Sequence, residues 1–164
     1  MNSLEELIAA YMAHRMPEAR EIVVSELSRI YGGSSQETFS FRASWQAGGE
    51  TITRRLILRR DATAGLIVAE RDLEYNVYRA LAGQGLPIPG VYFLELDPKW
   101  LERPFFIMDL CPGKPGSPFV PTDPYDGHGT AIGEQYWTIL GQLAAIDHRA
   151  VGLESLRNGN ARIG

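Results

Sequence analysis

The order of hydrophobic and polar residues indicates a β-hairpin in the first third of the chain. Apolar and polar side chains alternate strictly over residues 39–46, a period of two that is typical of a strand with one buried face. Gly48 and Gly49 then predict a tight turn. The next run, residues 51–59, contains the uninterrupted apolar segment Leu56-Ile57-Leu58, which indicates a strand buried on both faces.

Other apolar runs predict three further strands and three helices. Strands are expected over residues 21–31, 91–96 and 104–110. A capping box at Ser3 and Glu6 predicts an N-terminal helix that ends near Arg15. A second helix is predicted from one apolar stripe, formed by Leu66, Leu73, Val77 and Leu81. A third is predicted from Gly133 to about His148.

The order of these elements predicts an α+β fold. Three strands, one helix and two strands joined by short connections favour a five-stranded antiparallel sheet with the helix packed across it. Residues 1–110 would form this first lobe. A connector rich in proline and glycine is predicted over residues 111–132, and residues 133–164 would begin an incomplete helical lobe.

Two acidic residues, Glu70 and Glu74, lie within the apolar stripe of the second predicted helix. A buried carboxylate without a partner is costly, so a nearby cation is expected. Arg59 and Arg60 directly follow the buried strand, and we predict that one of them reaches one of the glutamates. Glu74 is favoured, because Glu70 lies one turn nearer the helix start. A purely structural ion pair is the alternative at this point.

Composition and charge narrow the classes of partner. The 164 residues carry a net charge of −4 and show no basic face, which excludes a nucleic-acid-binding surface. No apolar run approaches the ~20 residues that span a bilayer, so we predict no membrane contact and a soluble, cytoplasmic protein. The three histidines share no ligand spacing with the single cysteine, so no metal site is predicted. Cys111 itself is expected to be a buried apolar residue.

Several segments in this order resemble the N-terminal lobe of the aminoglycoside phosphotransferase-like kinases, close to their choline-kinase-like branch. The resemblance covers roughly residues 3 to 155. It rests on these segments: Gly32-Gly33-Ser34-Ser35, Leu56-Ile57-Leu58-Arg59-Arg60, Glu70-Arg71-Asp72-Leu73-Glu74-Tyr75, Leu86-Pro87-Ile88-Pro89-Gly90 and Arg103-Pro104-Phe105-Phe106-Ile107-Met108-Asp109. It implies a protein-kinase-like small lobe that binds ATP.

The resemblance also implies a role for each matching residue. The glycine-rich turn would place backbone N–H groups and hydroxyls against the phosphates, through Gly33, Ser34 and Ser35. Arg59 would stand where such kinases have a phosphate-binding lysine, held by Glu74. Met108 would border the adenine. The backbone of Asp109, Leu110 and Cys111 would form the hinge that hydrogen-bonds the adenine edge.

The family's catalytic loop, His-Gly-Asp-x-x-x-x-Asn, and the metal-binding Asp that follows it do not occur in this sequence. We therefore predict no catalytic residue and no metal ligand in this chain, and no turnover from the chain alone. The complete family member would use magnesium with ATP and transfer a phosphoryl group to a hydroxyl of a small molecule. One alternative is a non-catalytic remnant that binds a nucleotide or a protein, with a homodimer formed through helix 133–148. Another is a small domain without a ligand.

Overall fold

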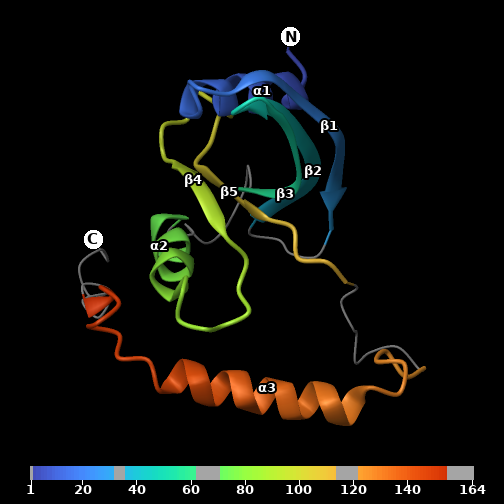
Figure 1. Ribbon diagram of the computed structural model, residues 1–164, viewed down its shortest axis with the longest axis vertical. Coiled ribbons are helices and arrows are strands. Elements are labelled where there is room, and N and C mark those ends of the chain that lie inside the picture. The colour runs from blue at the N-terminus through green and yellow to red at the C-terminus, as the bar shows by residue number, and fades with distance from the viewer. Residues whose placement is uncertain (1, 32–35, 62–70, 114–121, 155–164) are drawn as a thin grey trace. The chain divides into compact units, whose positions relative to one another are not determined.

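The computed structural model describes residues 2–31, 36–61, 71–113 and 122–154, and these contain five strands and three helices (Figure 1). All neighbouring strands are antiparallel, in the order β1-β2-β3-β5-β4. The predicted fold class is therefore confirmed. The elements in chain order are α1 (Leu4–Arg15), β1 (Arg20–Ile30), β2 (Gln36–Ala47), β3 (Glu50–Asp61), α2 (Arg71–Leu81), β4 (Val91–Glu95), β5 (Phe105–Asp109) and α3 (Gly129–Ala144).

The hairpin of β2 and β3 forms as its sequence predicts. Ala47 pairs with Glu50, and the two residues between them, Gly48 and Gly49, have φ values of 59° and 84°. Positive φ at both central positions suits a two-residue hairpin turn and favours glycine. β3 is consequently the middle strand of the sheet, paired with β2 on one side and with β5 on the other.

The sheet is covered on both faces. Leu56 and Leu58 of β3 belong to a core beneath α1, whereas Ile57 between them belongs to a second core beneath α2. β5 divides in the same way, with Phe105 on the α1 side and Phe106 on the α2 side, both fully buried. This alternation confirms that β3 is buried on both faces.

Helix α1 closes the larger core. The predicted capping box is present: Glu6 N–H donates to Ser3 Oγ at 3.2 Å, and Ser3 N–H donates to Glu6 Oε2 at 2.9 Å. The buried side of the helix carries Ile8, Tyr11 and Met12. Burial raises the pKa of the Tyr11 hydroxyl to about 12, so this hydroxyl stays protonated and donates or accepts hydrogen bonds only as a neutral group.

Helix α2 packs with a different stripe from the predicted one. All four side chains are half-buried, but Tyr75 and Tyr78 pack against the second core, whereas Leu73 and Val77 do not belong to it. The two tyrosine rings offer more contact area than the branched side chains, and Tyr75 Oη also donates to the Tyr92 carbonyl at 3.3 Å. The helix therefore turns its aromatic side toward the sheet. Leu66 lies outside the described residues.

The chain divides into two compact units, residues 1–79 with 89–110 and residues 80–88 with 111–164. The second unit contains α3, which runs from Gly129 to Ala144 rather than from 133 to 148. At its end the hydrogen bonds tighten: Ala145 N–H donates also to the Gln142 carbonyl and Ile146 N–H donates to the Leu143 carbonyl, both at 3.2 Å, so the regular helix stops there.

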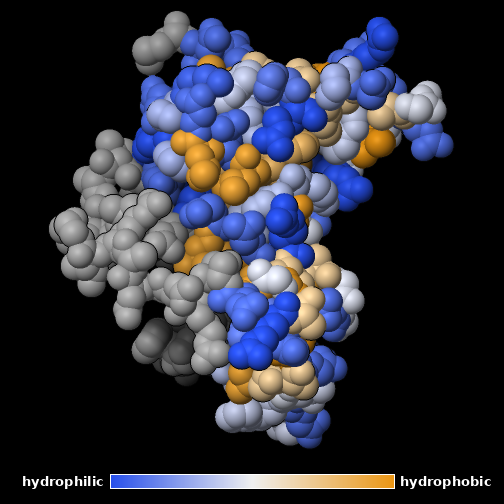
Figure 2. Space-filling model, turned by 90° about the vertical axis from the view of Figure 1, so that its left-hand side faces the viewer, coloured by the Kyte–Doolittle hydropathy of each residue, from blue (hydrophilic) through white to orange (hydrophobic). Residues whose placement is uncertain are grey.

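Apolar residues are not confined to the two cores. No side chain of α3 is buried, and Tyr136, Trp137, Leu140 and Leu143 are exposed. A view of one face of the molecule likewise shows hydrophobic patches interrupting a mainly hydrophilic surface (Figure 2). None of the helices in the described ranges combines the length and the apolar character that crossing a bilayer requires.

Candidate functional site

The predicted ion pair between β3 and α2 is present. Strand alternation points Arg59 to the same face as Ile57, toward α2. Its Nη1 lies 2.5 Å from Oε1 of Glu74. Both side chains are about one quarter exposed, at 25% and 23%, so solvent or a ligand can reach them. Glu70, the competing partner, lies outside the described residues.

Arg71 joins this pair, a contact that the sequence did not predict. Its side chain is almost completely buried, at 1% exposure. Nη1 of Arg71 donates to Oε2 of Glu74 at 3.1 Å, while Nε donates to Oδ1 of Asp61 at 2.8 Å. Nη2 also pairs with Asp61. Because each carboxylate oxygen of Glu74 meets a different arginine, Arg71 fixes the carboxylate that holds Arg59.

A buried aromatic ring supports both cations. The Cζ atoms of Arg59 and Arg71 lie 5.9 Å and 6.0 Å from the centroid of the Phe106 ring. At these distances the negative face of the ring attracts a guanidinium group, more strongly in a desolvated place. The four charged residues and this ring, namely Arg59, Asp61, Arg71, Glu74 and Phe106, form what we call the β3–α2 charge network.

Arg60, the other candidate for the predicted pair, points to the opposite face. It donates to Glu37 Oε2 from Nε at 3.1 Å and from Nη2 at 2.7 Å. Arg103 Nη1 donates to the same oxygen at 3.0 Å, and Arg29 lies 3.4 Å from Oε1. Burial alone would raise the pKa of Glu37, but the hydrogen bond from Arg60 and the charges of the three arginines outweigh it and lower that pKa. Glu37 therefore stays ionised. From β2 its carboxylate forms ion pairs with Arg29 of β1 and Arg60 of β3.

The predicted hinge residues lie at the end of β5. Met108 is buried in the core beneath α2. The N–H of Asp109 donates to the Gly90 carbonyl at 2.9 Å, and the N–H of Leu110 donates to the Arg55 carbonyl at 3.1 Å. Both N–H groups are therefore already used in backbone hydrogen bonds of the sheet. The prediction that Cys111 is buried is wrong: it is exposed, because the chain has left the sheet two residues before it.

The carboxylate of Asp109 faces the α1 side of the sheet. Its Oδ1 accepts a hydrogen bond from Tyr92 Oη at 2.6 Å, and its Oδ2 accepts one from Gly90 N–H at 3.1 Å. Burial and this contact with Asp109 raise the pKa of Tyr92. The Asp109 side chain thus anchors β4 to β5 and points away from the β3–α2 charge network.

Two further predictions concern the phosphate loop and a metal site. Gly33, Ser34 and Ser35, the predicted phosphate loop, lie outside the described residues. In the described part of the chain, no group of three or more His, Cys, Asp or Glu side chains could hold a metal ion.

What the described site offers is a guanidinium at the end of a central strand, fixed by a carboxylate that a buried second arginine orients. Such an arrangement suits the binding of a phosphate group.

Known proteins resemble this chain in fold and in sequence. A crystal structure of a proposed aminoglycoside phosphotransferase from Ralstonia eutropha JMP134 superposes with a TM-score of 0.60 at 22% identity, over 92% of this chain and 40% of that one. This likeness shows the shared fold. The mouse protein acyl-CoA dehydrogenase family member 10 is 26% identical over 136 residues, which are 79% of this chain but only 12% of the mouse protein. The chain thus spans less than half the length of the first of these relatives and about an eighth of the second.

A family model matches most of the chain. The model of the phosphotransferase enzyme family, abbreviated APH, matches residues 26–162, which include β2, β3, α2 and β5 and therefore the whole charge network. The chain belongs to the phosphotransferase enzyme family.

Proposed function

We propose that this chain is the nucleotide-binding lobe of an ATP-dependent phosphotransferase that acts on a hydroxyl of a small molecule. The observation that carries the proposal is the fixed position of Arg59, which Glu74 holds at the end of the central strand and which Arg71 supports through Glu74. Kinases place a cation from this strand, paired with a helix glutamate, against the ATP phosphates.

An arginine at this position suits phosphate oxygens. A guanidinium offers parallel N–H donors that can grip two oxygens at once, whereas a lysine offers a single point charge. Because the network orients the group before the ligand arrives, less side-chain entropy is lost on binding. Magnesium would accompany the ATP phosphates and neutralise part of their charge.

The predicted hinge would complete the nucleotide site. Met108 would lie under the adenine ring, since its side chain is in the core that also contains Ile57 and Phe106. The N–H groups of Asp109 and Leu110 already donate within the sheet. The adenine edge would therefore be recognised by the N–H of Cys111 and by backbone carbonyls of the hinge. Gly33, Ser34 and Ser35 would cover the phosphates.

The test is a calorimetric titration with ATP, with and without magnesium. Loss of a charge-assisted contact of about 1.5–3 kcal/mol should weaken ATP binding about 10- to 100-fold in Arg59→Ala. Glu74→Gln should weaken it less, because Arg59 remains but loses its orientation. Arg59→Lys should keep part of the affinity.

Arg42→Ala is the matched control, because Arg42 is an exposed arginine of the neighbouring strand whose carboxylate partner, Glu26, lies at 2.8 Å on β1. It should bind ATP as the unaltered protein does. Equal ATP affinity in the Arg59→Ala and Arg42→Ala proteins would remove the reason for assigning Arg59 to phosphate binding.

The exposed helix α3 favours a second candidate, a protein-binding role through self-association. Tyr136 and Trp137 are 59% and 69% exposed, and Leu140 and Leu143 are also exposed. A second copy of the chain would cover these apolar side chains. Sedimentation velocity should then show a dimer that Trp137→Glu converts to a monomer, whereas a monomer at all concentrations would contradict this candidate.

A further inference from the structure

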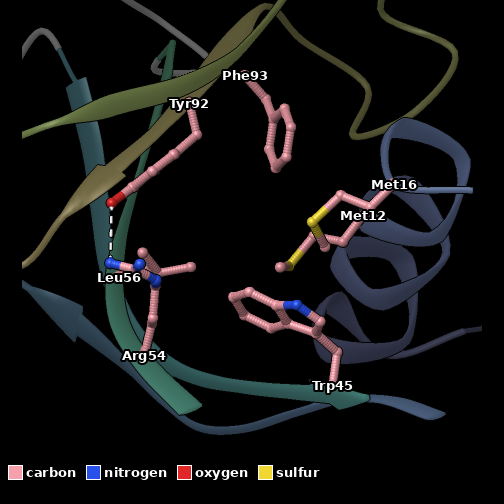
Figure 3. Close-up of a pocket in the computed structure, with 7 residues that line it drawn as sticks. All are labelled: Met12, Met16, Trp45, Arg54, Leu56, Tyr92 and Phe93. Atoms are coloured by element: carbon pink, nitrogen blue, oxygen red, sulfur yellow. Dashed lines mark hydrogen bonds between the residues drawn. The ribbon is translucent and has the colours of Figure 1, made fainter. Parts of the chain in front are cut away.

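A cavity of about 170 Å³ lies on the α1 side of the sheet (Figure 3). Its body is apolar: Met12 of α1 and Met16, the residue that caps the end of α1, face Trp45 of β2, Leu56 of β3 and Phe93 of β4. A closed apolar cavity of about 150 Å³ takes up a benzene-sized molecule, so this volume has room for one aromatic ring. Methionine side chains are flexible and polarisable, so they adapt to a ring placed between them.

One end of this cavity is polar. Arg54 and Tyr92 complete its wall, and Arg54 Nη1 donates to Tyr92 Oη at 3.3 Å, as the dashed line in Figure 3 marks. Tyr92 Oη in turn donates to Asp109 at 2.6 Å. Among the described residues, no carboxylate lies within ion-pair distance of Arg54. The cavity therefore ends at the cation Arg54. No acidic side chain of the described residues contacts it directly and neutralises its charge.

These two ends define a class of ligand. We propose that the cavity binds a small aromatic carboxylate, with its ring among Met12, Met16, Trp45 and Phe93 and its carboxylate on Arg54. The ring would replace the missing van der Waals contacts of the cavity wall. The carboxylate would accept a bidentate hydrogen bond from the guanidinium at the solvent-exposed end, which avoids burying its charge.

The cavity is separate from the β3–α2 charge network. Leu56 belongs to the cavity wall, but the next residue, Ile57, belongs to the core on the other face, where Arg59 also points. The proposal therefore does not depend on nucleotide binding. It also does not use the hinge backbone or any residue assigned to the phosphates.

The chain provides its own probes for a test by NMR. Its four methionines include Met12 and Met16 in the cavity wall and Met108 on the opposite face of the sheet. With ¹³C-methyl methionine and a titration of phenylacetate, the methyl signals of Met12 and Met16 should shift with one saturable curve. The Met108 signal should stay in place and report that the fold is intact.

Arg54→Gln separates the two parts of the proposal. Loss of the charge-assisted contact should weaken phenylacetate binding by about tenfold or more, while toluene, which lacks the carboxylate, should bind this variant and the unaltered protein alike. Arg42→Gln, another exposed arginine of the sheet, should leave both affinities unchanged. The proposal is overturned if phenylacetate leaves the Met12 and Met16 signals in place, or if Arg54→Gln and Arg42→Gln bind it equally well.

Discussion

The two faces of the sheet differ in the kind of side chain that covers them. Beneath α1, ten buried residues form the main core, and all of them are apolar or aromatic. Beneath α2, the described core has three buried apolar residues, Ile57, Phe106 and Met108, and the four charged residues of the β3–α2 charge network lie beside Phe106. The α1 face can therefore supply most of the hydrophobic stabilisation, and the α2 face holds fixed charges.

This difference indicates how a single strand would serve both stability and the proposed nucleotide binding. A side chain that must present a charge to a ligand cannot itself contribute much apolar burial. Arg59 is held in place by the Glu74 carboxylate and by the Phe106 ring, which is fully buried. The opposite face then has to stabilise β3. Substitutions in the core of the α1 face should change the free energy of unfolding alone, whereas those on the α2 face should also change nucleotide affinity.

The largest expected effect is that of Phe105→Ala. The Phe105 side chain is fully buried beneath α1, where it packs against Tyr11 with ring centroids 4.7 Å apart. Its removal should lower the free energy of unfolding by about 3–5 kcal/mol, through lost burial and the cavity left behind. Urea denaturation followed by circular dichroism measures this change.

Phe106→Ala is the matched variant on the other face. It removes an equally buried ring, so the stability loss should be similar, but it also removes the support of Arg59 and Arg71. ATP affinity, measured where both variants are folded, should fall in Phe106→Ala alone. An equal fall in ATP affinity in both variants would contradict the idea that only the α2 face contributes to nucleotide binding.

Arg71→Ala should have the next largest effect on stability after these two variants. It leaves the carboxylates of Asp61 and Glu74 without the arginine that they share, and breaking a buried ion pair costs about 3–5 kcal/mol. Both carboxylates are about one quarter exposed and can partly regain water, so we expect about 2–3 kcal/mol in urea denaturation. A loss below about 0.5 kcal/mol would show that the network is not needed to hold α2 against β3.

A smaller, pH-dependent effect is expected for Glu37→Gln. The folded-state pKa of Glu37 lies below its ordinary value of 4.5, so its contribution to stability is present above pH 4.5 and is lost as the pH falls through the folded-state value. At pH 7 the variant should be less stable by about 1.5–3 kcal/mol, the value of hydrogen bonds to a charged group. Thermal unfolding between pH 7 and pH 3 should show the difference shrinking; a constant difference would contradict this assignment.

Ser3→Ala should have the smallest effect. It removes the side-chain cap of α1, whose Oγ accepts the N–H of Glu6, and such a loss costs about 1 kcal/mol. Because α1 covers only the apolar face, ATP affinity should not change. A measurable change in that affinity would show that the two faces are coupled even through the start of α1.

The sequence predicted most of the fold because its signals were local. Strict alternation defined β2, two glycines defined the hairpin, and an apolar run with no polar break defined β3. Each of these patterns depends on residues close together in the chain. The end of α3 was placed too far along, because apolar residues at helical spacing continue to Ile146, whereas the backbone hydrogen bonds already tighten at Ala145 and Ile146.

The candidate site was predicted only in part. Arg59 and Glu74 could be paired because a carboxylate in an apolar stripe requires a cation. Arg71 was missed because it lies outside the predicted leucine stripe, and because α2 turns its tyrosines toward the sheet. The spacing of three residues between Arg71 and Glu74 was an available signal for their contact. Asp61, by contrast, becomes a partner only through tertiary packing.

If both proposals hold, β3 would contact two chemically unlike ligands. Its residue Leu56 would touch an aromatic carboxylate, and its residue Arg59 would touch a nucleotide, three positions further along and on the other face. A shift of this strand caused by one ligand would be felt by the other. Such an influence is reciprocal: whatever factor the carboxylate applies to nucleotide affinity, the nucleotide applies to the affinity for the carboxylate. β3 would then be the coupling element of an allosteric pair, with no movement of either covering helix required.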